Sequence, residues 1–153
     1  LENKFIELSK KSLLNFLEKF EKGELKETPQ ENSKATLAPK IDSNFQKIDW
    51  NCVSNEIDQK IRSLNPKYGA FTFLGNKRVK IYKSSPTENT SKLGPGKIGI
   101  SEDGKLLVGC SQETAIKIDT VQMEGKSVIQ SEEFIRGYRS LITQEDKFDS
   151  NVQ

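Results

Sequence analysis

The sequence predicts a mainly β protein with flanking helices, in which a small five-stranded barrel follows a linker and an isolated N-terminal helix. Three observations indicate this class. Apolar residues recur every three or four positions near the N-terminus, as in an amphipathic helix. Residues 24–48 are polar and show no sustained period. From residue 70 onward the apolar period becomes two, with Gly-Asn and Asp-Gly turn signals between the runs.

We expect a helix over residues 3–22, because its apolar side chains follow helical spacing and Gly23 stands where a glycine often ends a helix. The helix has one apolar stripe, and an amphipathic helix of this kind needs a partner surface. The chain starts with Leu1 and its only methionine is Met123, so we expect a piece of a longer protein. The stripe is formed by Ile6, Leu13, Leu17 and Phe20.

Residues 24–48 contain Pro29 and Pro39 and are interpreted as a linker. A second helix is expected over residues 53–64, capped by Asn51 or Ser54 and ended by Asn65-Pro66. Its apolar stripe consists of Val53, Ile57, Ile61 and Leu64, and Trp50 is expected to anchor the segment just before it.

Five short strands are expected to follow. Gly75-Asn76 predicts a two-residue hairpin, and a slip of the apolar phase near Asp119-Thr120 predicts a bulge. Residues 84–96 are rich in Ser, Thr, Pro and Gly and are expected to form a mobile loop. Five strands with one face bare do not make a stable flat sheet, so we expect an OB-like five-stranded barrel. The expected strands are 70–74, 78–83, 97–101, 105–110 and 115–123.

A closing helix is expected from a Ser131 cap to Leu141, with a frayed tail after Thr143. Arg136 and Arg139 lie on this acid-rich helix, and we expect ion pairs with Glu132 or Glu133, with RNA contact as the alternative.

Charge is unevenly distributed along the chain, although the formal net charge is only +2. Residues 1–39 hold seven basic and seven acidic groups, residues 40–101 hold eleven and five, and residues 102–153 hold six and ten. From Lys60 to Ser101 nine cations accompany one acid, Glu88. An excess of this size favours a polyanion such as RNA, and a solvated lysine-rich surface is the alternative.

The sequence contains no histidine and only two cysteines, Cys52 and Cys110. The commonest general base and metal ligand are therefore absent, and a structural zinc site is excluded because it needs four such ligands. We expect two free, buried thiols in a cytoplasmic protein. No apolar run approaches the ~20 residues of a membrane-spanning helix, so no membrane partner is expected.

Nine cations are candidates for RNA binding. Val79 and Ile81 are expected to point inward, which puts Arg78 and Lys80 together with Tyr82 on the outer face of one strand. Proteins contact A-form RNA mainly at phosphates and 2′-hydroxyls, which cations on such a face suit. The nine candidates are Lys40, Lys47, Lys60, Arg62, Lys67, Lys77, Arg78, Lys80 and Lys83.

Three aromatic residues near these cations suggest a base-stacking platform as a second possibility. Phe71 and Phe73 are expected in the barrel core instead, and Tyr68 stays open between the two roles.

An ordered set of motifs resembles the methionyl-tRNA formyltransferase family over nearly the whole chain. Tyr68 stands where that family usually has proline. The matching motifs are Ile48-Asp49-Trp50, Arg62-Ser63-Leu64-Asn65-Pro66, Gly69-Ala70-Phe71-Thr72, the strand 77–83, Pro95-Gly96, Asp103-Gly104, Gly125-Lys126, the segment 131–139 and the upstream Ala35-Thr36-Leu37-Ala38-Pro39-Lys40.

The resemblance implies that residues 1–25 are the last helix of a catalytic domain, residues 26–47 an interdomain linker and residues 48–153 the C-terminal domain. It implies that the parent enzyme transfers a formyl group from 10-formyltetrahydrofolate to initiator methionyl-tRNA in translation initiation. The catalytic and folate-binding residues would lie in the missing N-terminal domain, so this chain would bind no cofactor, would be inactive alone and would help to hold the tRNA. We expect a monomer, with pairing through the exposed N-terminal helix as the alternative.

Two other functions stay open. The same module occurs in enzymes that formylate sugar nucleotides or oxidise formyltetrahydrofolate, where the dense cation block from Lys60 to Ser101 would have no explanation. A free-standing OB-like binding module is the third hypothesis, and the unpartnered first helix disfavours it.

Overall fold

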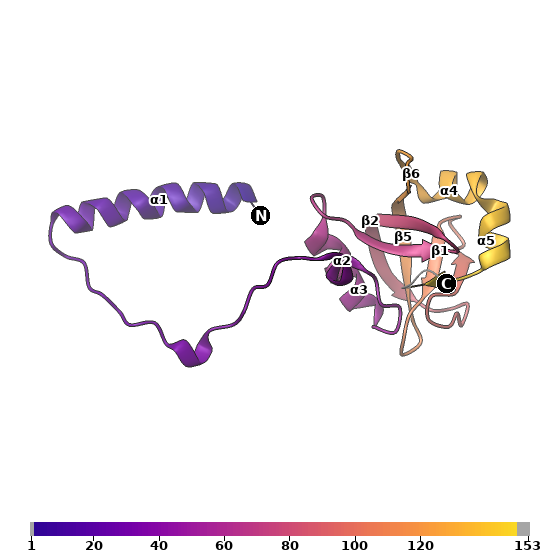
Figure 1. Cartoon of the computed structure of the whole chain (residues 1–153), viewed down its shortest axis with the longest axis horizontal. Helices are drawn as coiled ribbons and strands as arrows, with labels where there is room; N and C mark the ends of the chain where they lie inside the picture. Colours follow the sequence, from indigo (N-terminus) through magenta and orange to yellow (C-terminus); the bar gives the residue numbers. More distant parts are fainter. Residues whose placement is uncertain (1, 150–153) are drawn as a thin grey trace. The chain divides into compact units, whose positions relative to one another are not determined.

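The computed structural model describes residues 2–149, and the chain divides into two units between Pro39 and Lys40. The first unit holds helix α1 (Glu2–Glu21) and the short 3-10 helix η1 (Asn32–Lys34), and the second holds the β-sheet with the other helices (Figure 1). None of the described helices combines the length and the apolar character that crossing a membrane requires.

Helix α1 confirms the first expected helix and its end. Gly23 has a φ of +65°, its N–H donates to the carbonyl of Phe20 at 3.0 Å, and Glu24 N donates to Lys19 O at 2.9 Å. A left-handed residue with these bonds is a common helix C-cap. The apolar stripe of α1 has no cover within its own unit, since Leu13 is 58 % and Phe20 65 % exposed.

The second unit is a curled antiparallel sheet of seven strands, in the order β3-β4-β5-β2-β1-β7, with β6 paired to β5. The class is as expected, but the count of five is wrong, because β6 and β7 are too short for an alternation to show in the sequence. The elements are α2 (Ser43–Gln46), α3 (Ser54–Leu64), β1 (Ala70–Leu74), β2 (Lys77–Glu88), β3 (Ile98–Ile100), β4 (Leu106–Gly109), β5 (Thr114–Met123), β6 (Val128–Gln130), α4 (Ser131–Gly137), α5 (Arg139–Glu145) and β7 (Phe148–Asp149).

The β2–β5 pair contains two bulges. Ile81 pairs with Val121 and Ser84 pairs with Ile118, and the single Lys83–Thr120 pair between them leaves Tyr82 and Asp119 without opposite residues. The bulge expected near Asp119-Thr120 is confirmed, and the one at Tyr82 is additional. Because a bulge bends its strand and increases the local twist, the two together curl the sheet.

The loop expected over residues 84–96 is wrong in its first part, because residues 84–88 belong to β2 and pair with β5. Pro86 explains the error, since proline in a run argues against a central strand. Beyond Ile81, however, β1 has ended and β2 is paired on one side only, which is where a strand tolerates proline.

Helix α3 ends at Leu64 as expected, and Ile57, Ile61 and Leu64 join the core. Its cap differs from the prediction. Val53 occupies the N-cap position without a side-chain bond, and the N–H of buried Ser54 donates to Thr114 Oγ1 at 3.0 Å. A partner on β5 thus replaces the local cap and ties α3 to the sheet.

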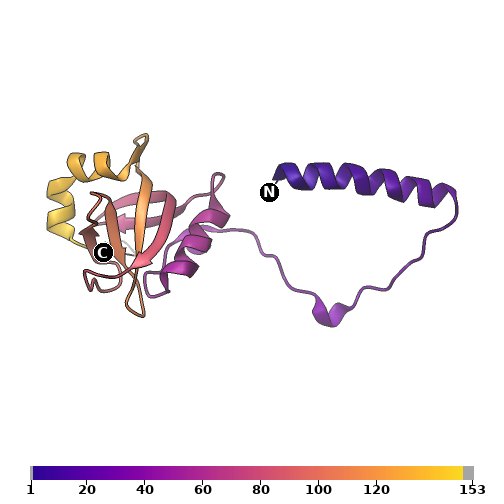
Figure 2. The same cartoon turned by 180° about the vertical axis from the view of Figure 1, so that it is seen from behind.

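The expected closing helix is two helices, α4 and α5, which meet at Tyr138 (φ −122°, ψ 23°). Gly137, a poor helix former, precedes this break, and Tyr138 packs on buried Phe134 with ring centroids 5.0 Å apart. Ser131 is a buried first-turn residue and not the cap, which is Gln130. Within residues 2–149 neither arginine of these helices forms an ion pair, contrary to expectation. Helix α3 lies on one side of the curled sheet and α4 with α5 on the other (Figure 2).

The tail expected to fray after Thr143 is ordered as far as Asp149, and residues 150–153 lie outside the described part of the chain. Strand β7 pairs with β1, and the buried ring of Phe148 stacks on Trp50 at 5.8 Å with an interplanar angle of 13°. Phe148 N donates to Gly96 O at 2.8 Å, and Ile98 N donates to Asp146 O at 2.9 Å. These two bonds link the β7 end of the sheet to the segment that enters β3.

A buried hydrogen-bond chain fixes the same region. Trp50 Nε1 donates to Thr72 Oγ1 at 3.0 Å, and Thr72 Oγ1 donates to Asp149 O at 2.8 Å. Thr72 is fully buried on β1, so its hydroxyl joins the segment before α3 to the end of the described chain.

Both cysteines are free. Cys110 is buried, which raises the pKa of its thiol to about 12, and Cys52 is half-buried.

We predict that Thr72→Val lowers the free energy of unfolding by about 1–3 kcal/mol, because the buried indole N–H of Trp50 loses its acceptor. Urea unfolding followed by tryptophan fluorescence measures this. Thr90→Val, at an exposed loop position, is the matched control. Equal unfolding midpoints for the two variants would show that the Thr72 hydroxyl contributes nothing.

Candidate nucleic-acid interface

The outer face of β1 carries two phenylalanines. Ala70 and Leu74 belong to the core cluster and Thr72 is fully buried beside them, so Phe71 and Phe73 project from the opposite face. The expectation that these two rings lie in the barrel core holds for Phe71 only in its burial, because the ring lies outside the core cluster. Phe73 is half-buried on the same face, so the expectation fails for it. Phe71 is nevertheless only 3 % exposed, so another group must cover it.

One such group is Arg78 on β2. The hairpin pairs Phe71 with Lys80 and Phe73 with Arg78, while Val79 and Ile81 are buried on the inner face as expected. The guanidinium carbon of Arg78 lies 3.9 Å from the centre of the Phe71 ring. We call Phe71, Phe73, Arg78 and Lys80 the outer cluster.

Aromatic contacts fix the position of Arg78 in the outer cluster. Phe73 meets Phe71 edge to face, with centroids 5.6 Å apart and planes at 85°. Cation–π contact of this kind stabilises by about 0.5–1 kcal/mol at an exposed site. Within residues 2–149, Arg78 Nε is buried without a hydrogen-bond partner.

Lys80 lies beside the arginine and opposite Gln122 on β5. A Cβ at Gly69 would stand 3.3 Å from Lys80 Cδ, so the glycine leaves room for the lysine stem. Tyr82 donates to Gln122 Oε1 at 2.8 Å, and Gln122 Nε2 donates to Lys126 O at 2.7 Å. These bonds fix the wall of a hollow of about 210 Å³, lined by Arg78, Lys80, Gln122, Met123, Glu124 and Gly125.

Lys77 begins β2 and is exposed. Within the described residues, neither Lys77 nor Lys80 forms an ion pair. Lys83 follows the Tyr82 bulge, and its ammonium lies 4.0 Å from Asp119, which also pairs with Lys105. The β2 cations thus separate into a cluster at the start of the strand and one lysine at an internal ion pair.

Other predicted candidates have internal contacts. Lys60 donates to the carbonyl of Lys47 and lies 5.5 Å from the Phe45 ring centre, and its burial lowers the pKa of its ammonium group. Arg62 Nε is 2.7 Å from Asp58 Oδ2.

The remaining three candidates lie at separate places. Lys67 is exposed, with its ammonium 5.4 Å from the ring centre of Tyr68. Lys40 is exposed at the start of the second unit, and the backbone of Lys47 forms an isolated bridge with Phe71.

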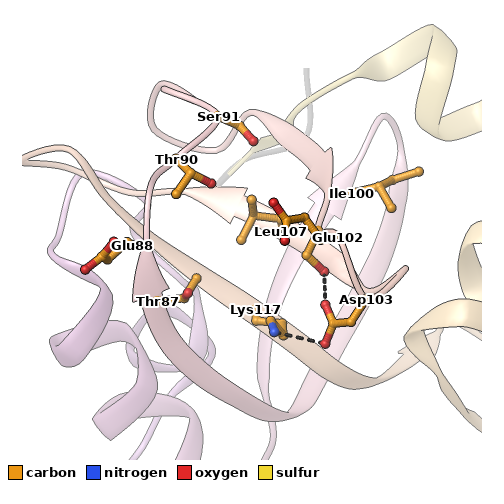
Figure 3. A pocket seen from close by; sticks show the side chains of 10 residues that line it. Thr87, Glu88, Thr90, Ser91, Ile100, Glu102, Asp103, Leu107 and Lys117 are labelled. Carbon is orange, nitrogen blue, oxygen red and sulfur yellow. Dashed lines mark hydrogen bonds and ion pairs between the residues drawn. The ribbon is translucent and has the colours of Figure 1, made fainter.

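A larger hollow of about 500 Å³ lies between the far end of β2 and the β3–β4 hairpin (Figure 3). Asp103 there accepts from Ser101 Oγ at 2.6 Å and from Lys117 Nζ at 3.0 Å, and these bonds hold the pKa of its carboxyl at about 2. Glu88 and Glu102 line the same hollow, so carboxylates outnumber its one lysine. The lining of this hollow is therefore net negative, which disfavours a polyanion there.

The outer cluster was missed by sequence reasoning as a unit, although a signal was present. The two-residue hairpin at Gly75-Asn76 forces Phe73 to lie opposite Arg78. If Arg78 faces outward, Phe73 must do so too.

Comparison with known proteins identifies the family. The model of the formyl transferase C-terminal domain matches residues 40–139. The chain belongs to this family. It is 32 % identical over 142 residues to methionyl-tRNA formyltransferase of Enterococcus faecalis, which covers 93 % of this chain and 45 % of the relative. It is 34 % identical over 113 residues to the enzyme of the same name in Orientia tsutsugamushi, covering 74 % and 36 %. The chain thus spans about half the length, or less, of these curated relatives.

Solved structures with the same fold include HypX from Aquifex aeolicus. Its complex with tetrahydrofolic acid matches at a TM-score of 0.57 and 24 % identity, covering 85 % of this chain and 22 % of HypX. A HypX variant matches at a TM-score of 0.60 and 22 % identity, covering 88 % and 23 %. At this identity the likeness shows the fold alone.

We predict that Arg78→Ala lowers the free energy of unfolding by about 1 kcal/mol, because it removes the cover of the Phe71 ring. Lys77→Ala, at the exposed neighbouring position, should change it by less than about 0.5 kcal/mol. Urea unfolding of both variants gives the comparison. An equal decrease in the free energy of unfolding of both variants would mean that the contact between Arg78 and Phe71 contributes nothing to stability.

Proposed function

We propose that this chain is the tRNA-holding C-terminal portion of a methionyl-tRNA formyltransferase, the enzyme that transfers a formyl group to initiator methionyl-tRNA in translation initiation. The relatives at 32–34 % identity carry that name and supply the substrate class. The observation that carries the binding role is the group of three cations at the start of β2, none of which forms an ion pair within the described residues: Lys77, Arg78 and Lys80.

The physical reason for this assignment is the charge of RNA. Each phosphate neutralised by a lysine or arginine releases condensed counterions, so cations without internal partners bind more effectively than cations already paired. Lys77 and Lys80 meet this condition, whereas Arg62 and Lys83 already face carboxylates. We therefore place the main RNA contact at the start of β2, with Lys40, Lys47, Lys60, Arg62, Lys67 and Lys83 as flanking contacts.

We further propose that the curled sheet works as an OB-like barrel. The backbone bonds of Phe148 with Gly96 and of Ile98 with Asp146 support this, because they join the two ends of the sheet. In barrels of this class an outer strand face commonly binds nucleic acid, which is where the outer cluster lies.

The catalytic role would belong to a second domain, which would bind 10-formyltetrahydrofolate. Within the 153 residues there is no histidine to act as a general base, so the chain alone would hold tRNA without transferring the formyl group. The uncovered stripe of α1 would pack on that domain, and the whole enzyme would work as a monomer in the cytoplasm.

A second candidate is a formyltransferase module that does not touch RNA, as in the related enzymes that formylate sugar nucleotides or oxidise formyltetrahydrofolate. The two candidates differ in one property, the salt-dependent affinity for tRNA, which only the first requires.

Lys80→Glu should weaken tRNA binding about tenfold at ~0.1 M salt and flatten the log–log slope of affinity against salt by ~0.7–0.9 for each phosphate that the protein no longer neutralises. Lys92→Glu is the matched control, because Lys92 is exposed beyond the opposite end of β2 and its reversal changes the net charge equally. Titrations of labelled tRNA at several salt concentrations measure both quantities. Identical affinities and slopes for the two variants would rule out β2 as the contact.

A further inference from the structure

We infer that the outer cluster binds one unpaired nucleotide of RNA, whose base stacks on the open face of the Arg78 guanidinium while its phosphate contacts Lys80. This inference rests on the proposed function and adds the kind of RNA segment that the surface recognises.

The guanidinium of Arg78 is held in place by aromatic contacts. The guanidinium carbon of Arg78 lies over the Phe71 ring, 3.9 Å from its centre, and Phe73 meets Phe71 edge to face with ring centroids 5.6 Å apart. Unpaired bases stack on arginine planes as they do on aromatic rings. An arginine already held in place loses little conformational freedom when a base arrives, so more of the stacking energy appears as affinity.

A hollow lies beside the guanidinium of Arg78. Arg78 is half-buried and lines the hollow of about 210 Å³, which the β5–β6 turn bounds at Glu124 and Gly125. Glu124 N donates to Arg78 O at 2.9 Å, so the turn and the strand keep their separation. At ~30 Å³ for each liquid water, the hollow has the volume of about seven waters, which is compact and suits one flat ring.

The residues that line the hollow have mixed charge, since they include Arg78, Lys80 and Glu124. The carboxylate weakens the attraction of the two cations for a free anion, whereas the exocyclic amino group of a base can donate to it. Lys80, which forms no ion pair within residues 2–149, can then hold the phosphate of the same nucleotide. The combination fits a nucleotide better than inorganic phosphate.

Base pairing decides which segments of an RNA can reach Arg78. In an A-form duplex each base is stacked on its neighbours, so its flat face cannot reach a protein side chain. A base that stacks on Arg78 must come from a loop, a bulge or a single-stranded end. The surface should therefore prefer single-stranded RNA to duplex RNA of the same length.

The test compares Arg78→Lys with the parent chain, since lysine keeps the charge and removes the plane. Oligoadenylate is the single-stranded probe, and an adenylate–uridylate duplex of equal length is the paired one. Arg78→Lys should weaken oligoadenylate binding about tenfold, at an unchanged salt slope, and duplex binding less than twofold. Lys92→Arg, the reverse exchange at an exposed position beyond the far end of β2, is the matched control and should change neither.

Ultraviolet cross-linking of oligoadenylate to the parent chain gives a second readout that does not depend on how a variant folds. Cross-linked peptides should contain residues 71–73 or 122–125. Cross-links elsewhere, or equal effects of Arg78→Lys on both probes, would overturn the inference. In that case salt-dependent tRNA binding through Lys80 would still leave the proposed function standing, whereas no tRNA binding by the parent chain at low salt would end both.

Discussion

The pairing of β2 with β5 across two bulges is the constraint on which the rest of the second unit depends. It is the longest strand pair, and the extra residues Tyr82 and Asp119 curl it around the core. Val79 and Ile81 thereby meet the apolar side chains of α3 on the inside. The same alternation leaves Arg78 and Lys80 on the outside, so one strand supplies both the core and the proposed binding surface.

The outer cluster joins stability to function. A phenylalanine on an outer sheet face would normally be a large exposed apolar group, but Phe71 is buried and the guanidinium of Arg78 lies over its ring. The ring in turn holds the guanidinium in one orientation. On the inner face of β1, stacking and buried hydrogen bonds among Trp50, Thr72 and Phe148 hold the strand in place. The strand that carries the Phe71 ring is therefore fixed. Because Arg78 is part of the packing, its replacement should change both the stability of the fold and the proposed RNA binding.

The sequence predicted the elements with strong local signals and missed those that depend on distant partners. The period of α1, the hairpin at Gly75-Asn76 and the bulge at Asp119 are local, and all three are confirmed. Strand β7 depends on the packing of Phe148 against Trp50, almost a hundred residues earlier in the chain. No local sequence pattern indicates this contact. The orientation of Phe71 and Phe73 was mistaken because hydrophobicity favoured the core, although the hairpin register already paired Phe73 with Arg78. For the proposed RNA contacts the sequence offered nine cations, and only their partners in the fold, such as Asp58 for Arg62, separate them.

The most direct test of the account is a lysine footprint of the parent chain with and without tRNA. Brief acetylation followed by mass spectrometry measures the modification rate of each lysine. The account predicts that tRNA protects Lys77 and Lys80, while Lys92 beyond the far end of β2 and Lys117 in the acidic hollow keep their rates. Protection of Lys92 and Lys117 with unchanged rates at Lys77 and Lys80 would contradict it.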